Sequence, residues 1–309
     1  MKIRAEIYAP SHTEDRIMAE LSQRIARLSH LLATLKPERK TRVADIGANP
    51  VHVPAYQFLL DQGGCEVIGF EPDPRAFKEL QEQKNGSNET YLPFAVGDDA
   101  EHTLHVCNQS GFTSLLKPSK DFTDYTGHFR RGMKVMQEIP LRTHRLDDIA
   151  DLPECDLLKI DIQGGEAEVF RNGPIFMANL AAVITEVAFI PLYENQPLLD
   201  EQMRILRDAD LHLSKFLAFK RVRLKGNLQT RLAANNEHRN QLVDADAVFH
   251  RQVSPTSKIA SEKLKHLAIL ADSVFDSCDV TLRCLDVLID RGEVVLAEAE
   301  EYVERLEAR

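Results

Sequence analysis

The sequence predicts an α/β fold: a doubly wound, mostly parallel sheet with helical segments at both ends of the chain. Residues 40–190 alternate short apolar strands with amphipathic helical stretches, and several strands end in an acid. Such alternation produces right-handed crossovers and a sheet covered on both faces. We therefore expect an N-terminal helical segment (1–39), an α/β domain (40–252) and a C-terminal helical extension (253–309).

Composition narrows the class of protein. The 309 residues carry a net charge of -10, and a surface that acidic repels phosphate backbones, so we expect no nucleic-acid partner. No apolar run approaches the roughly 20 residues of a membrane span, and the N-terminus has no apolar secretory core. The five cysteines lack C-x-x-C spacing, which indicates reduced thiols. We expect a cytoplasmic protein without a membrane span.

Helical patterns fill both ends of the chain. Residues 11–36 predict a helix, with capping-box spacing between Ser11 and Glu14 and a stop at Pro37. Its apolar residues follow a narrow heptad seam: Met18, Leu21, Ile25, Leu28, Leu32 and Leu35. A second stripe runs from Leu264 to Ile289, and residues 293–309 resume the helix. We expect the two ends to pack together, within one chain or, as we favour, across the two-fold axis of a homodimer.

The α/β domain is expected to contain its elements in regular order. Strands are expected at 42–49, 66–74, 91–99, 156–162 and 180–189, and helices at 54–63, 75–85 and 165–173. Residues 101–108 and 139–149 are added strands in this interpretation, and 211–224 and 244–251 complete one edge of the sheet.

Two acids follow the first two strands. Asp45 ends the first strand, and Gly47 permits a turn with close approach of a ligand to the backbone. Asn49 and His52 stand where a dinucleotide fingerprint has glycines, so a ligand without phosphates fits better. Glu71 ends the second strand, where an acid grips the two hydroxyls of a ribose. As an N-cap Glu71 is not needed, because Asp73 serves the following helix.

Three further acids are expected at the same edge of the sheet. Asp161 ends the strand "LLKI", Gly164 and Gly165 allow a sharp turn, and Glu166 begins a helix. Glu186 ends the next strand. Because the carboxyl ends of parallel strands share one rim, we expect Asp161, Glu166 and Glu186 to converge there. Paired carboxylates suit a cationic nucleoside such as S-adenosylmethionine better than a diphosphate.

The motifs "VADIGAN", "VIGFEPDP", "AVGD", "LLKIDIQGGEAEVFRNG", "ITEVAF" and "DADAVFHR" occur in this order over roughly residues 40–250. In this order and spacing the chain resembles FkbM-type methyltransferases. The resemblance implies a class I methyltransferase Rossmann-like fold, with S-adenosylmethionine as cofactor. It also implies methyl transfer to a hydroxyl of a sugar, glycoconjugate or secondary metabolite.

The resemblance also implies roles for single residues. Asp45, Gly47 and Asn49 would line the methionine part of the cofactor, and Glu71 would hold its ribose. Asp98 would lie at the adenine edge, and a loop containing Thr113 and Ser114 would cover the cofactor. Gln163 stands where the family usually has an acid.

The chemistry leaves alternatives open. Methyl transfer to a hydroxyl requires removal of a proton, and Asp161 is the first candidate for the base. Glu166 and Glu186 would bind acceptor hydroxyls or assist that base. The carboxylates would alternatively hold a divalent cation. Two other functions compete: a dinucleotide-dependent oxidoreductase and a non-catalytic nucleoside-binding interaction module.

Overall fold

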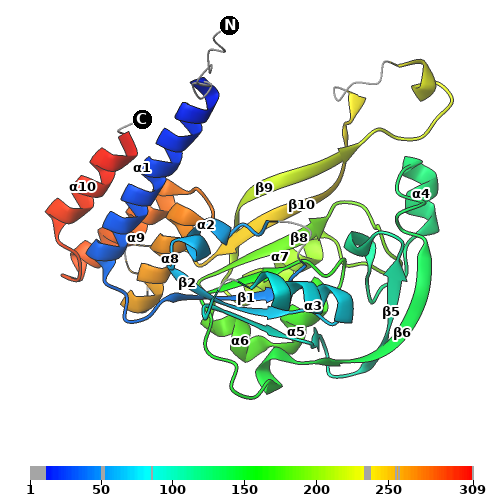
Figure 1. The fold of residues 1–309 in the computed structure, drawn as a ribbon, viewed down its shortest axis with the longest axis horizontal. Coiled ribbons are helices and arrows are strands. Elements are labelled where there is room, and N and C mark those ends of the chain that lie inside the picture. The colour runs from blue at the N-terminus through cyan, green and yellow to red at the C-terminus, as the bar shows by residue number, and fades with distance from the viewer. Residues whose placement is uncertain are drawn as a thin grey trace, which may run out of the picture. The chain divides into compact units, whose positions relative to one another are not determined.

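The computed structural model describes residues 12–49, 53–84, 86–232, 238–254, 256 and 258–307. The chain forms two compact units (Figure 1). Residues 40–258 form the α/β unit, and both ends of the chain, 1–39 and 259–309, together form the terminal unit. The two terminal segments therefore pack together within one chain, one of the two arrangements that the sequence left open.

A seven-stranded sheet forms the centre of the α/β unit, in the order β3-β2-β1-β7-β8-β10-β9. The strands are β1 (Thr41–Ile46), β2 (Cys65–Phe70), β3 (Glu89–Leu92), β7 (Leu157–Ile160), β8 (Ala182–Ala188), β9 (His212–Val222) and β10 (Gln241–His250). The first five run parallel, and β10 is antiparallel to both β8 and β9. Strand order reverses between β1 and β7, which is where doubly wound sheets bind ligands. The expected fold class is confirmed.

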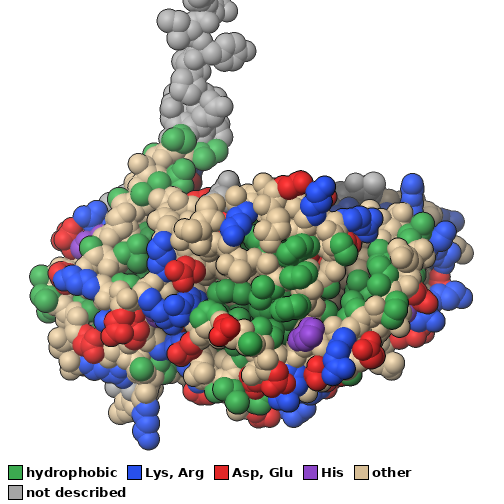
Figure 2. All heavy atoms as spheres, turned by 60° about the horizontal axis from the view of Figure 1, so that its bottom comes forward, with side chains coloured by type: hydrophobic (Ala, Val, Ile, Leu, Met, Phe, Trp, Pro, Cys, Tyr) green, Lys and Arg blue, Asp and Glu red, His purple; other side chains and the backbone are tan. Residues whose placement is uncertain are grey.

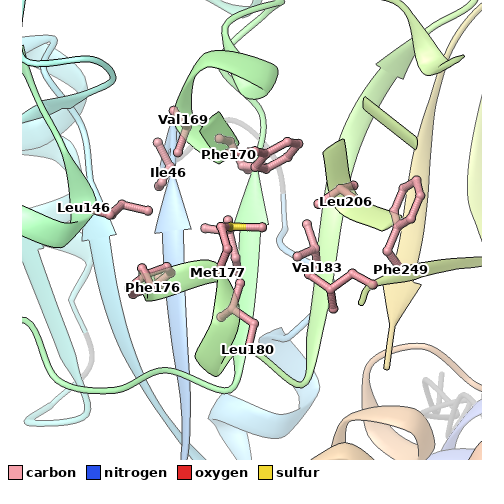
Figure 3. Close-up of a cluster of buried hydrophobic side chains, with 14 of the residues drawn as sticks. Ile46, Leu146, Val169, Phe170, Phe176, Met177, Leu180, Val183, Leu206 and Phe249 are labelled. Atoms are coloured by element: carbon pink, nitrogen blue, oxygen red, sulfur yellow. The ribbon is translucent and has the colours of Figure 1, made fainter. Parts of the chain in front are cut away.

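Right-handed crossovers place the connecting helices on opposite faces of this sheet. Helices α2 (Gln57–Asp61) and α3 (Pro74–Gln83) connect β1, β2 and β3. Helices α5 (Glu166–Asn172), α6 (Pro174–Asn179) and α7 (Leu199–Asp208) cover the other face, where their apolar side chains meet those of the strands (Figure 3). The core cluster there includes Ile46, Val169, Phe170, Phe176, Met177, Val183, Leu206 and Phe249.

A second sheet has the order β4-β6-β5, with β4 (Ala95–Val96), β5 (Glu101–Cys107) and β6 (Val135–His144). The single strand expected over 91–99 is wrong: it divides at Pro93 into β3 of the large sheet and β4 of the small one. Proline cannot donate a ladder hydrogen bond, so pairing stops there. Next to β5 and β6, the short helix η1 (Ser110–Phe112) and α4 (Lys120–Thr126) add Phe112 and Phe122 to a second small core. This core carries the loop of residues 110–114.

The terminal unit consists of α1 (His12–Leu35), α8 (Ser261–Ser273), α9 (Cys278–Asp290) and α10 (Leu296–Glu307). Within one chain, α1 contacts both α8 and α10. Leu28, Leu31 and Leu35 of α1 are buried, whereas Met18 and Leu21 of the same seam are exposed. Asp272 has two polar partners in this interior: its Oδ1 lies 2.6 Å from the Arg27 guanidinium and accepts from the Tyr302 hydroxyl at 2.7 Å.

Two details of the terminal unit differ from expectation. The helix expected over 261–290 is interrupted between α8 and α9, where Asp276 adopts a left-handed φ of 51°. Cys278, expected on the buried stripe, is exposed because α9 begins a new helical phase. The expected cap at Ser11 lies outside the described residues.

The surface mixes side-chain types. On the face shown in Figure 2, hydrophobic side chains gather in a hollow, and charged side chains of both signs lie around it. No helix among the described residues combines the length and apolarity needed to cross a bilayer.

Candidate active site

A cavity of about 1130 Å³ opens at the carboxyl ends of the central strands. The strand ends supply Asp45, Glu71, Asp161 and Glu186 to its lining. Asn49, Thr113, Ser114, Lys159, Gln163, Lys220 and Asp246 also line it. The cavity therefore lies at the switch point, where the strand order reverses.

Asp45 is held by a tyrosine and a lysine at the end of β1. The Tyr56 hydroxyl donates to Asp45 Oδ2 at 2.6 Å, and Lys159 Nζ lies 3.1 Å from Oδ1. Burial lowers the pKa of Lys159, but the nearby carboxylates of Asp45 and Asp161 outweigh it and raise the pKa above its usual value. Lys159 is therefore a cation that pairs with Asp45 at the end of β1.

Gly47 is required by the turn that follows β1. Its φ is +80°, and a Cβ atom on Gly47 would lie 2.2 Å from the carbonyl oxygen of Asp161. The turns after β1 and β7 thus touch each other at the floor of the cavity. Any side chain at this position would push the two turns apart.

Glu166 fastens the turn that follows β7. Its Oε1 accepts from the backbone amides of Ile162 and Gly164, at 3.0 and 3.1 Å. The side chain is 1% exposed and does not line the cavity. Burial raises the pKa of Glu166 to about 7, although these two amides act in the opposite direction. The expected convergence of three carboxylates on one rim is thus reduced to Asp161 and Glu186.

Gln163 joins Asp161 to Glu186. Its Nε2 donates to Asp161 Oδ1 at 2.8 Å and to Glu186 Oε2 at 3.0 Å. Its Oε1 accepts from the hydroxyl of Tyr193 at 2.8 Å. Both hydrogens of the amide thus point at carboxylates.

The surroundings of Glu186 favour its protonated form. Burial, with the negative charges of Asp161 and Asp244, raises the pKa of Glu186 well above its usual range, against the effect of Lys220. Lys220 is engaged by Asp244, with Nζ 3.0 Å from Oδ2. Glu186 therefore keeps its proton to a higher pH than a solvent-exposed glutamate does.

Asp246 extends the acidic wall toward the edge of the sheet. It lies directly opposite Glu186 in the register of β10 and β8, so both side chains are on one face. Burial raises the pKa of Asp246, as does the charge of Asp161. The wall from β7 to β10 thus presents hydrogen-bond acceptors in a row.

Glu71 stands at the end of β2, 7% exposed. Its Oε1 accepts from the amide of Asp73 at 2.7 Å. Burial raises the pKa of Glu71 to about 7, although that amide acts in the opposite direction. The expected N-cap is confirmed for Asp73, whose carboxylate accepts from the amide of Arg75.

Asp98 is the second expected site residue, after Glu166, that the structure places outside the cavity. Asp98 does not line the cavity; its Oδ1 bonds to His102 at 2.7 Å and to the Thr143 hydroxyl at 2.9 Å, fastening the turn between β4 and β5. Its side chain therefore faces the small sheet, and the expected contact with an adenine edge is not formed by this arrangement. Ser114 does line the cavity, and its hydroxyl donates to the Gln163 carbonyl at 2.7 Å. His52 lies outside the described residues.

Sequence reasoning missed Tyr56, Lys159, Tyr193 and the central position of Gln163. Lys159 carried a signal, since a lysine inside the apolar strand "LLKI" needs a buried counter-charge. The two tyrosines carried none, because they reach the site from distant loops. Among the described residues, no group of three or more His, Cys, Asp and Glu side chains is arranged to hold a metal ion.

Comparison with known proteins identifies the family. A model of the methyltransferase FkbM domain matches residues 45–213, more than half of the chain. The chain belongs to this family. FkbM proteins are S-adenosylmethionine-dependent methyltransferases. Membership replaces the dinucleotide-dependent oxidoreductase that the sequence left open.

The three individual proteins described next are 28% identical to this chain or less over their aligned residues. The 2-O-methyltransferase NoeI of Sinorhizobium fredii is 28% identical over 166 residues, which cover 50% of this chain and 66% of that protein. Precorrin-6y C5,15-methyltransferase from Geobacter metallireducens is 12% identical with a TM-score of 0.33, over 74% of this chain and 87% of that one. LepI in complex with SAM is 11% identical with a TM-score of 0.33, over 73% and 46%. At these scores the two structures add no argument.

Proposed function

We propose that this chain transfers a methyl group from S-adenosylmethionine to a hydroxyl oxygen of a sugar or another polyhydroxylated acceptor. The observation that carries the proposal is the pair Asp161 and Glu186, joined by Gln163 at the switch point. The printed name of the Sinorhizobium fredii relative, a 2-O-methyltransferase, supports an oxygen acceptor.

The residues present fit the cofactor. Glu71 offers a buried carboxylate at the end of β2, where two ribose hydroxyls would donate to it. Gly47 keeps the floor of the cavity at backbone level, and the acidic lining suits a ligand with sulfonium and ammonium charges. When bound, S-adenosylmethionine supplies an electrophilic methyl group for an in-line displacement.

Asp161 and Glu186 have different roles toward the acceptor: one removes a proton and the other donates a hydrogen bond. Asp161 accepts the proton of the acceptor hydroxyl while the oxygen–methyl bond forms and the sulfur–methyl bond breaks. Glu186, with its raised pKa, is the neutral partner whose carboxyl group donates to a neighbouring acceptor oxygen. Asp246 accepts from further hydroxyls along the same wall.

Two isosteric variants test this division. Asp161→Asn removes the base, and we expect kcat to fall by at least roughly a hundredfold with cofactor affinity unchanged. Glu186→Gln keeps the shape of a protonated carboxyl, and we expect it to retain most of the turnover. The measurement is transfer of a radiolabelled methyl group to a panel of mono- and oligosaccharides.

Three results would count against the proposal. Equal losses in the two variants would reject the division of roles. Turnover unchanged by Asp161→Asn would remove Asp161 as the base. Cofactor binding with no transfer to any acceptor would favour the non-catalytic module.

We further propose a homodimer through the terminal unit. Ile17, Met18 and Leu21 of α1 are 57%, 64% and 38% exposed, although they continue the stripe that buries Leu28 and Leu35 against α8 and α10. A second copy of the same stripe would cover these residues. The absence of a nucleic-acid partner and a cytoplasmic location stay predictions of the sequence.

A further inference from the structure

The hydrogen-bond partners of the Gln163 side chain determine which way its amide faces. The buried hydroxyl of Tyr193, which is 0% exposed, lies 2.8 Å from Gln163 Oε1 and 3.2 Å from the Phe112 carbonyl oxygen, and donates its one hydrogen at the shorter distance to Gln163. The amide nitrogen then faces Asp161 and Glu186, whose oxygens accept its two hydrogens. An amide turned over would place its NH₂ group against the tyrosine and its oxygen against two carboxylates.

Hydrogen bonds also fix the backbone around Gln163. Its φ is +61°, a left-handed conformation that is unfavourable for a non-glycine residue. The Ser114 hydroxyl donates to its carbonyl oxygen at 2.7 Å, and Glu166 ties the amides on both sides of it. In this conformation the side-chain amide lies between the carboxyl groups of Asp161 and Glu186.

The surrounding charges explain why the amide is needed. Glu186 faces Asp161 at the end of β7, Asp244 and Asp246 on β10, and Glu166 on α5. Lys220 of β9 is engaged by Asp244, and Lys159 of β7 by Asp45. Lys159 attracts Asp161 and Lys220 attracts Glu186, but neither lysine bridges the two acids, whereas the two N–H groups of Gln163 bond to both.

We propose that Gln163 is a positioning residue whose amide holds Asp161 and Glu186 together in the place where a divalent cation would bridge two carboxylates. This inference rests on the proposed function for the use of the pair, but its structural content is independent of any acceptor. It follows that replacing the amide by a carboxylate creates three oxygen donors around one point, a set that suits Mn²⁺ or Mg²⁺.

Manganese alone serves as the probe. Calorimetric titration of Mn²⁺ into the wild-type chain, Gln163→Glu and Gln163→Glu/Asp161→Asn compares sites with two, three and two carboxylates. We expect Gln163→Glu to bind one ion at least tenfold more tightly than the wild type does. The double variant should return to the wild-type affinity. Equal affinity in the wild type and Gln163→Glu would overturn the inference, as would a tight ion in the wild type.

Gln163→Met provides a second measurement, because it keeps the volume and removes both donors. We expect the affinity for S-adenosylhomocysteine to stay within about twofold and kcat for methyl transfer to fall at least tenfold. Unchanged kcat would contradict a positioning role, and a parallel loss of cofactor affinity would indicate a merely structural one. If the wild type transferred no methyl group, the proposed function would fail, while the Mn²⁺ comparison would still decide this inference.

Discussion

At the scale of single residues, the site depends on contacts between turns that follow different strands. Gly47, after β1, meets the carbonyl of Asp161, after β7. Glu166 and Ser114 hold the second turn through its backbone, and Gln163 then presents its amide to the carboxylates. The geometry of the candidate site is therefore set by main-chain packing at the switch point, which a single added methyl group would disturb.

A comparison of Gly47 with Gly63 distinguishes the effect of close packing from that of backbone strain. Gly47 and Gly63 have φ values of +80° and +69°, but an added Cβ at Gly63 meets nothing within 4 Å. We expect Gly63→Ala to cost about 1 kcal/mol of unfolding free energy, from strain alone. Gly47→Ala should cost at least roughly 2 kcal/mol more and weaken cofactor binding, because the clash displaces the Asp161 turn. Urea unfolding of both variants measures the difference, and equal costs would contradict the close packing.

At the scale of elements, local pattern predicted most of the large sheet. Alternating strands and helices placed the starts of β1, β2, β7 and β8 within two residues, because each strand is an apolar run, but the expected ends of β1 and β2 ran on into the turns that follow. Helix α7 and the break between α8 and α9 were not anticipated. The break has no glycine or proline to signal it, although Asp276 adopts a left-handed φ there.

The candidate site was predictable to a similar degree. Acids at strand ends were found because strand direction fixes where they meet. Asp98 and Glu166 were also expected there, and both carboxylates instead bond within their own turns, which sequence spacing does not distinguish. Tyr56 and Tyr193 were out of reach of local reasoning, since their partners are chosen by tertiary folding.

Helix α1 changes character along its length, and this can be measured. Leu31 is 0% exposed against the other terminal helices, so Leu31→Ala should lower the unfolding free energy of the terminal unit by about 2–5 kcal/mol. Gln23→Ala, at an exposed position on the side of the same helix opposite Met18 and Leu21, should change it by less than about 0.5 kcal/mol. Urea unfolding followed by circular dichroism compares the two. Equal losses in the two variants would contradict the burial of Leu31 against the other terminal helices.

At the scale of the whole molecule, the exposed stripe on α1 predicts the oligomeric state. Light scattering should give twice the mass of the chain, and Met18→Glu/Leu21→Glu should give a single chain, because the added charges face the partner. Ala19→Glu/Gln23→Glu adds the same charge on the opposite side of the helix, about 100° per residue away, and should leave the dimer intact. A wild-type monomer would reject the proposal.

The central claim is that the cavity at the switch point binds the S-adenosyl group through Glu71. Calorimetric titration of S-adenosylhomocysteine between pH 6 and pH 8 tests it. Burial holds the pKa of Glu71 at about 7, so the carboxylate that accepts from the ribose is present above that pH and lost below it. We expect affinity to rise with pH in the wild type. Glu71→Gln should bind at least roughly tenfold more weakly, without pH dependence, and the exposed control Glu79→Gln should behave as the wild type. Wild-type affinity in Glu71→Gln would contradict the account.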